Sequence, residues 1–130
     1  MSYIKVVAGV IIKENKILIA RRKKGKSLEF MWEYPGGKVE ENESEKECLK
    51  RELLEEFSIE TEIKQFLTES FHDYVSFKIN LRAYLVTHIS GDFQLTDHDQ
   101  VVWITKEEFL NYDFAPADLP INEYLTENNV

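Results

Sequence analysis

The sequence predicts an α/β (α+β) domain in which helices pack against a mixed sheet. Two observations carry this prediction: runs rich in β-branched residues that read as strands, and an amphipathic helix that lies between two sets of them. The order of strands, helix, strands and helix is typical of a sandwich of helices on a sheet. The chain has 130 residues, the length of one ordinary domain, so we expect a single domain over residues 1–130.

The first elements are expected to be strands. Tyr3–Ile12 is rich in β-branched side chains, and Ile17–Arg21 returns across a polar turn at 13–16, which predicts a hairpin. Residues 32–37 then indicate a strand end and a tight turn. Pro35 cannot donate to a strand ladder, and the two glycines after it permit unusual backbone angles.

Residues 44–57 form the clearest helix. Ser44 and Glu47 have the spacing of a capping box, and Leu49, Leu53 and Phe57 fall on one apolar stripe. The remaining elements are expected as strands at 59–69 and 75–89 with a turn at His72–Tyr74, a short buried strand at Val101–Ile104, a short helix from the Thr105–Glu108 capping box to about Asn111, and a last helix at Leu119–Glu127.

Composition narrows the class of protein. The formal net charge of −8 argues against a general nucleic-acid binder, which needs a basic face to release counterions. Cys48 is the only cysteine, which favours a reducing compartment and excludes a zinc site built on several thiolates. The longest apolar run, Val6–Ile12, is too short to cross a bilayer and lacks the flanks of a signal peptide. We therefore expect a cytoplasmic protein without nucleic-acid or membrane partners.

Three glutamates of the predicted helix share one face. At about 100° per residue, Glu52, Glu55 and Glu56 lie within an arc of about 100° at the edge of the apolar stripe. Arg51 can pair with Glu47 and Glu55 at i±4, which leaves Glu52 and Glu56 without a partner. A hard divalent cation such as Mg²⁺ would compensate these charges, and Mg²⁺ with carboxylates and phosphate oxygens is the setting of phosphoryl transfer to water.

The alternative is a solvated acidic face. Glutamate is the commonest residue, 18 of 130, so acidic clusters arise by chance. On the helix alone this alternative is at least as good as a metal site. The spacing of residues before the helix decides between the two.

That wider spacing resembles the Nudix hydrolase family, whose box runs Gly-x5-Glu-x7-Arg-Glu-hydrophobic-x-Glu-Glu-x-Gly-hydrophobic. A chance match is on the order of 10⁻⁶ per start position. Ser58 departs from the pattern, because the family has glycine there, and a left-handed cap after the helix would be modestly strained. The matching residues are Gly37, Glu43, Arg51, Glu52, Leu53, Glu55, Glu56 and Ile59.

The resemblance implies a role for each matching position. Glu52, Glu55 and Glu56 would bind the metal, Mg²⁺ with Mn²⁺ as the alternative ion, and the backbone carbonyl of Gly36 would complete the site. Glu43 would be a supporting acid, and Arg51 would orient the catalytic glutamates by salt bridges. The fold implied is the Nudix α/β/α sandwich.

The flanking segments at 7–12, 20–22 and 32–40 resemble the MutT-like branch of that family. In that branch the arginine matching Arg22 contacts the nucleotide phosphates, and Gly37 and Lys38 fall in the substrate-binding segment. Arg22 also lies in the one basic cluster of the chain, at 21–26, and a planar guanidinium suits phosphate. A solvated hairpin exit is an equal explanation for the lysines of this cluster.

The segment 114–120 resembles the base-reading segment of MutT-like enzymes. Asp118 stands where enzymes specific for 8-oxoguanine usually have asparagine, and an ionised aspartate only accepts hydrogen bonds. It could accept from the amine of cytosine or from the N1–H and amine of guanine. A plain helix N-cap is an equally good explanation, since Pro120 lies in the first turn of the following helix.

A further catalytic acid is expected near 97–99. In the MutT-like branch a glutamate close to this position contacts the metal or serves as general base, and Asp97 is the nearest match. Asp99 is an alternative, as is His98, whose ordinary pKa suits base work. A polar loop of three solvated residues explains the segment as well.

The resemblance thus implies hydrolysis of a nucleoside triphosphate to the monophosphate and pyrophosphate, in nucleotide-pool cleaning or pyrimidine turnover. Two alternatives stay open: a nucleoside diphosphate derivative as the substrate, and a non-catalytic module that senses nucleotide. Both a monomer and a homodimer are compatible with the sequence.

Overall fold

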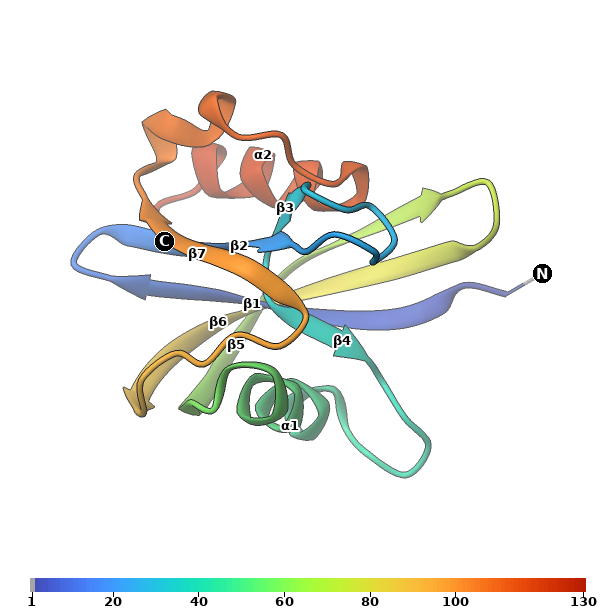
Figure 1. The fold of residues 1–130 in the computed structure, drawn as a ribbon, viewed down its shortest axis with the longest axis horizontal. Helices are drawn as coiled ribbons and strands as arrows, with labels where there is room; N and C mark the ends of the chain where they lie inside the picture. The colour runs from blue at the N-terminus through green and yellow to red at the C-terminus, as the bar shows by residue number, and fades with distance from the viewer. Residues whose placement is uncertain (1) are drawn as a thin grey trace.

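The computed structural model describes residues 2–130 and places one helix on each side of a sheet (Figure 1). No helix among these residues is long and apolar enough to cross a membrane. The elements are β1 (Ile4–Lys13), β2 (Lys16–Arg22), β3 (Trp32–Glu33), β4 (Gly36–Lys38), α1 (Glu45–Phe57), β5 (Glu60–Asp73), β6 (Lys78–Ser90), β7 (His98–Ile104), 3₁₀ turns at Lys106–Asn111 and Pro116–Asp118, and α2 (Leu119–Glu127).

The sheet is mixed, as predicted, and β1 is its central strand. β1 pairs with β6 in parallel and with β2 and β4 in antiparallel fashion. The strand order is β3-β2-β1-β6-β5, with β4 added to β1 and β7 added to β2. The short β4 therefore branches from the middle of the sheet and runs toward α1, where the predicted box lies (Figure 1).

Both faces of the sheet are buried, because successive side chains of β1 point to opposite sides. Val7 and Ile11 pack with the apolar stripe of α1, made of Leu49, Leu53 and Phe57. Ala8 and Val10 face the other way, into a cluster with Ile121 and Leu125 of α2. This alternation explains why β1 reads as a nearly continuous apolar run.

Helix α1 begins and ends close to the predicted bounds. Ser44 is the N-cap, and its hydroxyl and the Glu47 carboxylate form the expected capping box. Ser58 ends the helix in the left-handed region, with φ 58° and ψ 34°, and its N–H donates to the carbonyl of Leu54. The glycine-type cap of the family box is thus kept by a serine, at some cost in backbone strain.

We expect Ser58→Gly to stabilise the protein by about 0.5–1 kcal/mol, because glycine adopts a positive φ without the Cβ clash. Thermal unfolding of the two proteins measures the difference. Ser58→Ala, which keeps a Cβ and loses only the hydroxyl, is the matched control and should not gain stability. A lower midpoint for the glycine variant would contradict the assignment of strain to this cap.

Three predicted elements differ from the structure. The turn expected at His72–Tyr74 is wrong, because β5 continues to Asp73 and the chain turns at 74–77, where the Tyr74 N–H donates to the Phe77 carbonyl. The element after Thr105 is a 3₁₀ helix, although its capping box is present. The strand expected at Val101–Ile104 begins earlier, at His98.

Candidate active site

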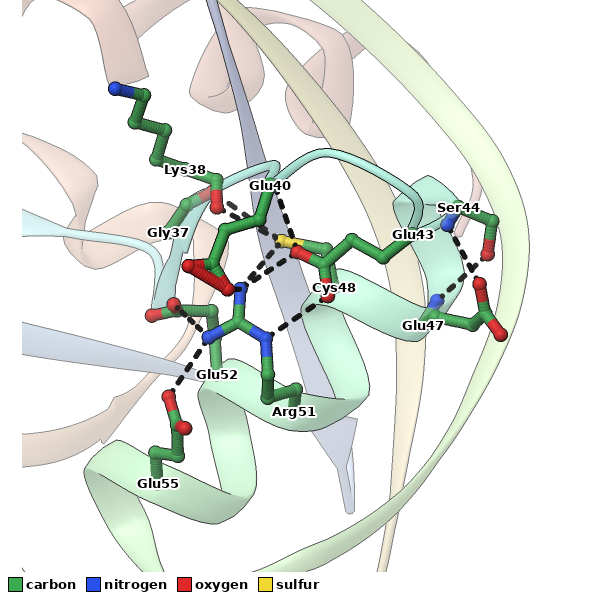
Figure 2. Close-up of polar contacts among 10 residues, drawn as sticks. All are labelled: Gly37, Lys38, Glu40, Glu43, Ser44, Glu47, Cys48, Arg51, Glu52 and Glu55. Carbon is green, nitrogen blue, oxygen red and sulfur yellow. Dashed lines mark hydrogen bonds and ion pairs between the residues drawn. The ribbon is translucent and has the colours of Figure 1, made fainter.

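Arg51 is the centre of a charged network between α1 and the loop that follows β4 (Figure 2). Its guanidinium binds both carboxylate oxygens of Glu43, at 2.7 and 3.0 Å. It also donates to Oε1 of Glu52 at 2.8 Å and to Oε1 of Glu55 at 2.9 Å, and lies 3.3 Å from Glu40. Bidentate pairing of this kind fixes the arginine in position, so the two helix glutamates are held relative to the loop.

The pairing of Arg51 with Glu47 predicted from the helical wheel is wrong. Glu47 instead turns back to the N–H of Ser44 and serves as the capping residue (Figure 2). The prediction that Glu52 lacks a partner is also wrong, because Arg51 reaches it. The Arg51 hydrogen bond, with a backbone N–H from Glu40, lowers the pKa of Glu43 to about 2, so this acid stays ionised.

Glu56 lies on the inner edge of the same helix face. Only 12% of its side chain is exposed, against 60% for Glu55. Burial raises the pKa of Glu56 to about 9, and the neighbouring Glu52 and the charges of Asp97 and Glu33 act in the same direction. Within residues 2–130 the protein itself therefore provides no cationic partner that would favour the ionised form of Glu56.

The donor set of this face fits a hard divalent cation. Its oxygens come from carboxylates, the ligands that Mg²⁺ prefers, and a cation would favour ionisation of Glu56, which burial and the neighbouring acids oppose. Among residues 2–130 no three acidic, histidine or cysteine side chains are already grouped to hold an ion, because Arg51 binds Glu52 and Glu55. Holding a cation therefore requires these side chains to shift.

The two glycines of β4 meet different neighbours. A Cβ on Gly37 would lie 2.2 Å from Oε2 of Glu52, so the absence of a side chain makes room for that carboxylate. A Cβ on Gly36 would lie 1.8 Å from the backbone carbonyl oxygen of Val7. Gly36 is therefore required by strand packing, whereas Gly37 is required by the position of Glu52.

A pocket adjoins this face, between the end of β2 and the segment before α2. It contains Arg22, whose guanidinium contacts the carbonyl of Ser27 and, at 3.1 Å, Oε2 of Glu33. Polar and aromatic groups line it together: Arg22, Glu33, Tyr34, Gly37, Tyr74 and Asp118. The predicted phosphate ligand and the predicted base-reading acid thus face one cavity.

Asp118 is buried at the inner end of this pocket. Its carboxylate accepts a hydrogen bond of 2.8 Å from the backbone N–H of Tyr34. Asp118 is the N-cap residue of α2, as the alternative predicted, but its side chain makes no hydrogen bond to the helix. Burial raises the pKa of Asp118 well above its ordinary value, and the charge of Glu33 adds to the effect.

Comparison with known proteins decides the family. The NUDIX domain model matches residues 7–124. The chain belongs to the Nudix family. It is 38% identical over 123 residues to the CTP pyrophosphohydrolase of Escherichia coli K12, which covers 95% of this chain and 91% of that protein. It is 37% identical over 114 residues to the 8-oxo-dGTP diphosphatase of Buchnera aphidicola subsp. Schizaphis graminum, covering 88% and 86%.

A solved structure agrees with this assignment. The solution structure of the E. coli ORF135 protein superposes with a TM-score of 0.87 at 37% identity, covering 98% of this chain and 91% of that one. The predicted family and the predicted α/β/α sandwich are therefore confirmed.

The segment 97–99 of this Nudix protein is divided among three environments. Asp97 pairs with Lys26 at 3.2 Å, and Asp99 pairs with Arg21 at 2.8 Å. His98 is buried on β7, so a loop of three solvated residues is wrong for it. Two of the three are near Glu56 of α1. The charge of Asp97 contributes to the raised pKa of Glu56, and Nδ1 of His98 lies 3.9 Å from Oε2 of Glu56.

The remaining predicted residues divide between the two parts of the site. Gly36 and Gly37 both line the pocket, and Gly37 also borders Glu52 of α1. The Lys38 side chain is exposed and is absent from the residues that line the pocket. Sequence reasoning did not single out Glu33 and Tyr34, which line the pocket. The sequence feature that could have identified Glu33 is its place between two aromatic residues, Trp32 and Tyr34. Both are buried, and a carboxylate between buried aromatics is unusual.

Proposed function

We propose that this Nudix protein hydrolyses nucleoside triphosphates to the monophosphate and pyrophosphate in the presence of Mg²⁺. The observation that carries the proposal is the junction at Gly37, which borders both the carboxylates of α1 and the pocket that holds Arg22 and Asp118. A phosphate chain that leaves this pocket past Gly37 meets Glu52. The triphosphate substrates named for the E. coli and Buchnera relatives support the same reaction.

Each group has a task in this reaction. Glu52, Glu55 and Glu56 would hold the cation, with the Gly36 carbonyl. Arg51, anchored by Glu43, would set the starting positions from which Glu52 and Glu55 shift to the cation. The bound cation supplies charge neutralisation on the phosphates and a water of lowered pKa. Arg22 would bind phosphate oxygens by its planar fork. Asp97, close to Glu56, is the proposed general base.

The base is expected to be cytosine or guanine, oxidised forms included. Glu33 and Asp118 both present carboxyl groups to the pocket, and each can accept from an exocyclic amine. Among the bases with such an amine, the CTP and 8-oxo-dGTP named for the relatives favour cytosine and guanine over adenine. Uracil and thymine carry carbonyl oxygens in place of the amine. Those oxygens would face carboxylates and lose hydrogen bonds to water without replacement.

A nucleotide panel tests this proposal. Purified protein with Mg²⁺ is given CTP, dCTP, dGTP, 8-oxo-dGTP, UTP and ATP, and ADP-ribose and a nucleoside diphosphate sugar are included. We expect pyrophosphate release that is fastest with a cytosine or guanine triphosphate and absent with EDTA. Preferential cleavage of ADP-ribose or the sugar derivative would replace the triphosphate proposal, and binding of nucleotide without any turnover would indicate a sensor.

Asp118→Asn is expected to raise stability increasingly with pH. The folded pKa of Asp118 lies above its unfolded value, so its stabilising contribution is complete at low pH and is lost as pH rises through the folded value. Asparagine does not titrate and can still accept from Tyr34, so the variant should be more stable than the parent at pH 9, by a margin that grows from pH 5 to pH 9. Chemical unfolding at pH 5, 7 and 9 measures this.

Asp99→Asn is the matched control, since Asp99 is an exposed partner of Arg21 whose pKa is lowered by that contact. The stability of Asp99→Asn relative to the parent should not increase as the pH rises. If Asp118→Asn is less stable than the parent at pH 9, the carboxyl group is not under the electrostatic strain described here.

A further inference from the structure

The geometry points to His98 as a positioning residue that joins the base pocket to the metal-binding face. One ring nitrogen holds Glu33, which lines the pocket, and the other faces Glu56 of α1. This inference rests on the proposed function for its consequence in turnover, but its structural part concerns two binding events that can be measured separately.

The first contact is to the pocket. Nε2 of His98 lies 2.8 Å from Oε2 of Glu33. Because a carboxylate at this distance accepts, the proton of this nitrogen points to Glu33. Arg22 donates to the same oxygen, Oε2, at 3.1 Å. Among residues 2–130 no hydrogen bond engages the second oxygen, Oε1, so His98 and Arg22 together orient Glu33 with one oxygen left for a ligand.

The second contact is to the metal-binding face. Nδ1 of His98 lies 3.9 Å from Oε2 of Glu56, beyond hydrogen-bond distance, and it has no hydrogen-bond partner in the described part of the chain. Only 1% of the His98 side chain is exposed. A buried polar atom without a partner is uncommon in folded proteins and needs a reason. The carboxylate that Nδ1 faces belongs to Glu56, a proposed ligand of the cation.

The imidazole ring of His98 is held in place from both sides. It stacks on Phe57, with ring centroids 5.1 Å apart and an angle of 20° between the planes. Phe57 is fully buried in the stripe of α1 and directly follows Glu56. On the other side, the pairing of β2 with β7 shifts by one residue at Arg21/Arg22, which leaves Asp99 as a bulge beside His98. A bulge re-aims the neighbouring side chain, and here it turns His98 inward.

Two substitutions separate the two contacts. The amide nitrogen of glutamine can take the place of Nε2, so His98→Gln keeps the donor to Glu33 and removes the nitrogen that faces Glu56. The side-chain amide of asparagine can place a polar atom where Nδ1 lies, so His98→Asn keeps a polar group beside Glu56 and loses the contact to Glu33. His88→Gln, a half-buried histidine of β6 that contacts the carbonyls of Ser90 and Gly91, is the control.

The test measures binding and turnover in parallel. Binding of CMP and GMP without metal is measured by calorimetry, the Mg²⁺ dependence of the unfolding temperature is measured without nucleotide, and kcat and KM are measured for the best substrate. His98→Asn should weaken CMP or GMP binding and raise KM by about tenfold, the size of one hydrogen bond to a charged group, with the Mg²⁺ midpoint within twofold of the parent. His98→Gln should raise the Mg²⁺ midpoint several-fold and lower kcat, with CMP or GMP binding nearly unchanged.

Two results would overturn the inference. If both variants match His88→Gln in nucleotide and Mg²⁺ binding, His98 positions neither carboxylate. If both variants weaken both kinds of binding equally, the residue has a purely structural role. A parent protein that hydrolyses no nucleotide would remove the proposed function, whereas the CMP, GMP and Mg²⁺ measurements would still decide the role of His98.

Discussion

Exchange of Glu56 for glutamine is expected to lower Mg²⁺-dependent turnover on the order of 10²–10³-fold, because several kcal/mol of charge stabilisation at the phosphates depend on the cation held there. Without metal, the same variant should be at least as stable as the parent. Glu56 is buried beside Glu52, and the charges of Glu33 and Asp97 oppose its ionisation, so a neutral amide is favoured in the empty site.

Kinetics with Mg²⁺ and thermal unfolding with EDTA measure these two effects. Glu60→Gln is the control, because Glu60 is an exposed residue at the start of β5 outside the charged network. A Glu56→Gln protein that keeps turnover within tenfold of the parent would contradict the assignment of this residue to the metal.

Gly37→Ala should produce the second large effect, a loss of activity in a protein that still folds. The new Cβ would lie 2.2 Å from Oε2 and 2.3 Å from Cδ of Glu52, so the carboxylate must move. Because the clash is with the far end of a flexible side chain, the fold can absorb it, but a misplacement of about 1 Å can lower turnover on the order of 10²-fold.

Gly36→Ala provides the contrast. Its Cβ would lie 1.8 Å from the carbonyl oxygen of Val7, which is backbone of the central strand and cannot turn away. We expect a destabilisation of about 1–3 kcal/mol or more, as for other overpacked sites. Circular dichroism and turnover, measured on both variants, separate the two cases. A Gly37→Ala protein with normal turnover, or one that unfolds as readily as Gly36→Ala, would show that Glu52 is not held against this glycine.

The sequence predicted those parts of the fold that local patterns determine. The helix at 44–57 was predicted because Ser44, Glu47 and the stripe of Leu49, Leu53 and Phe57 are all within one segment. The pairing of β1 with β6 in parallel could not be predicted, because it joins residues about 75 apart and no local pattern specifies the partner. The segment after Thr105 shows the limit of a cap signal, which marks a start and does not choose between a 3₁₀ and an α-helix.

Site residues that lie close together in the sequence could be predicted, whereas contacts between distant segments could not. The resemblance to the family box, a pattern within one segment, predicted the roles of Gly37, Glu43, Arg51 and the glutamates of α1. The helical wheel gave Arg51 one correct partner, Glu55, and one wrong partner, Glu47. It missed Glu43 and Glu40, because the wheel contains only helix residues and the loop before α1 brings these two to the guanidinium. Glu33 and His98 lie 65 positions apart on two strands, so only the folded chain shows that they meet.

The central claim is that the carboxylates of α1 form a divalent-cation site, and direct titration with Mn²⁺ tests it. Electron paramagnetic resonance of free Mn²⁺, in the absence of nucleotide, counts the ions that the protein removes from solution. We predict saturable binding to the parent, displacement by excess Mg²⁺, and loss of that binding in Glu56→Gln with retention in Glu60→Gln. Equal binding by the parent and Glu56→Gln would contradict the account.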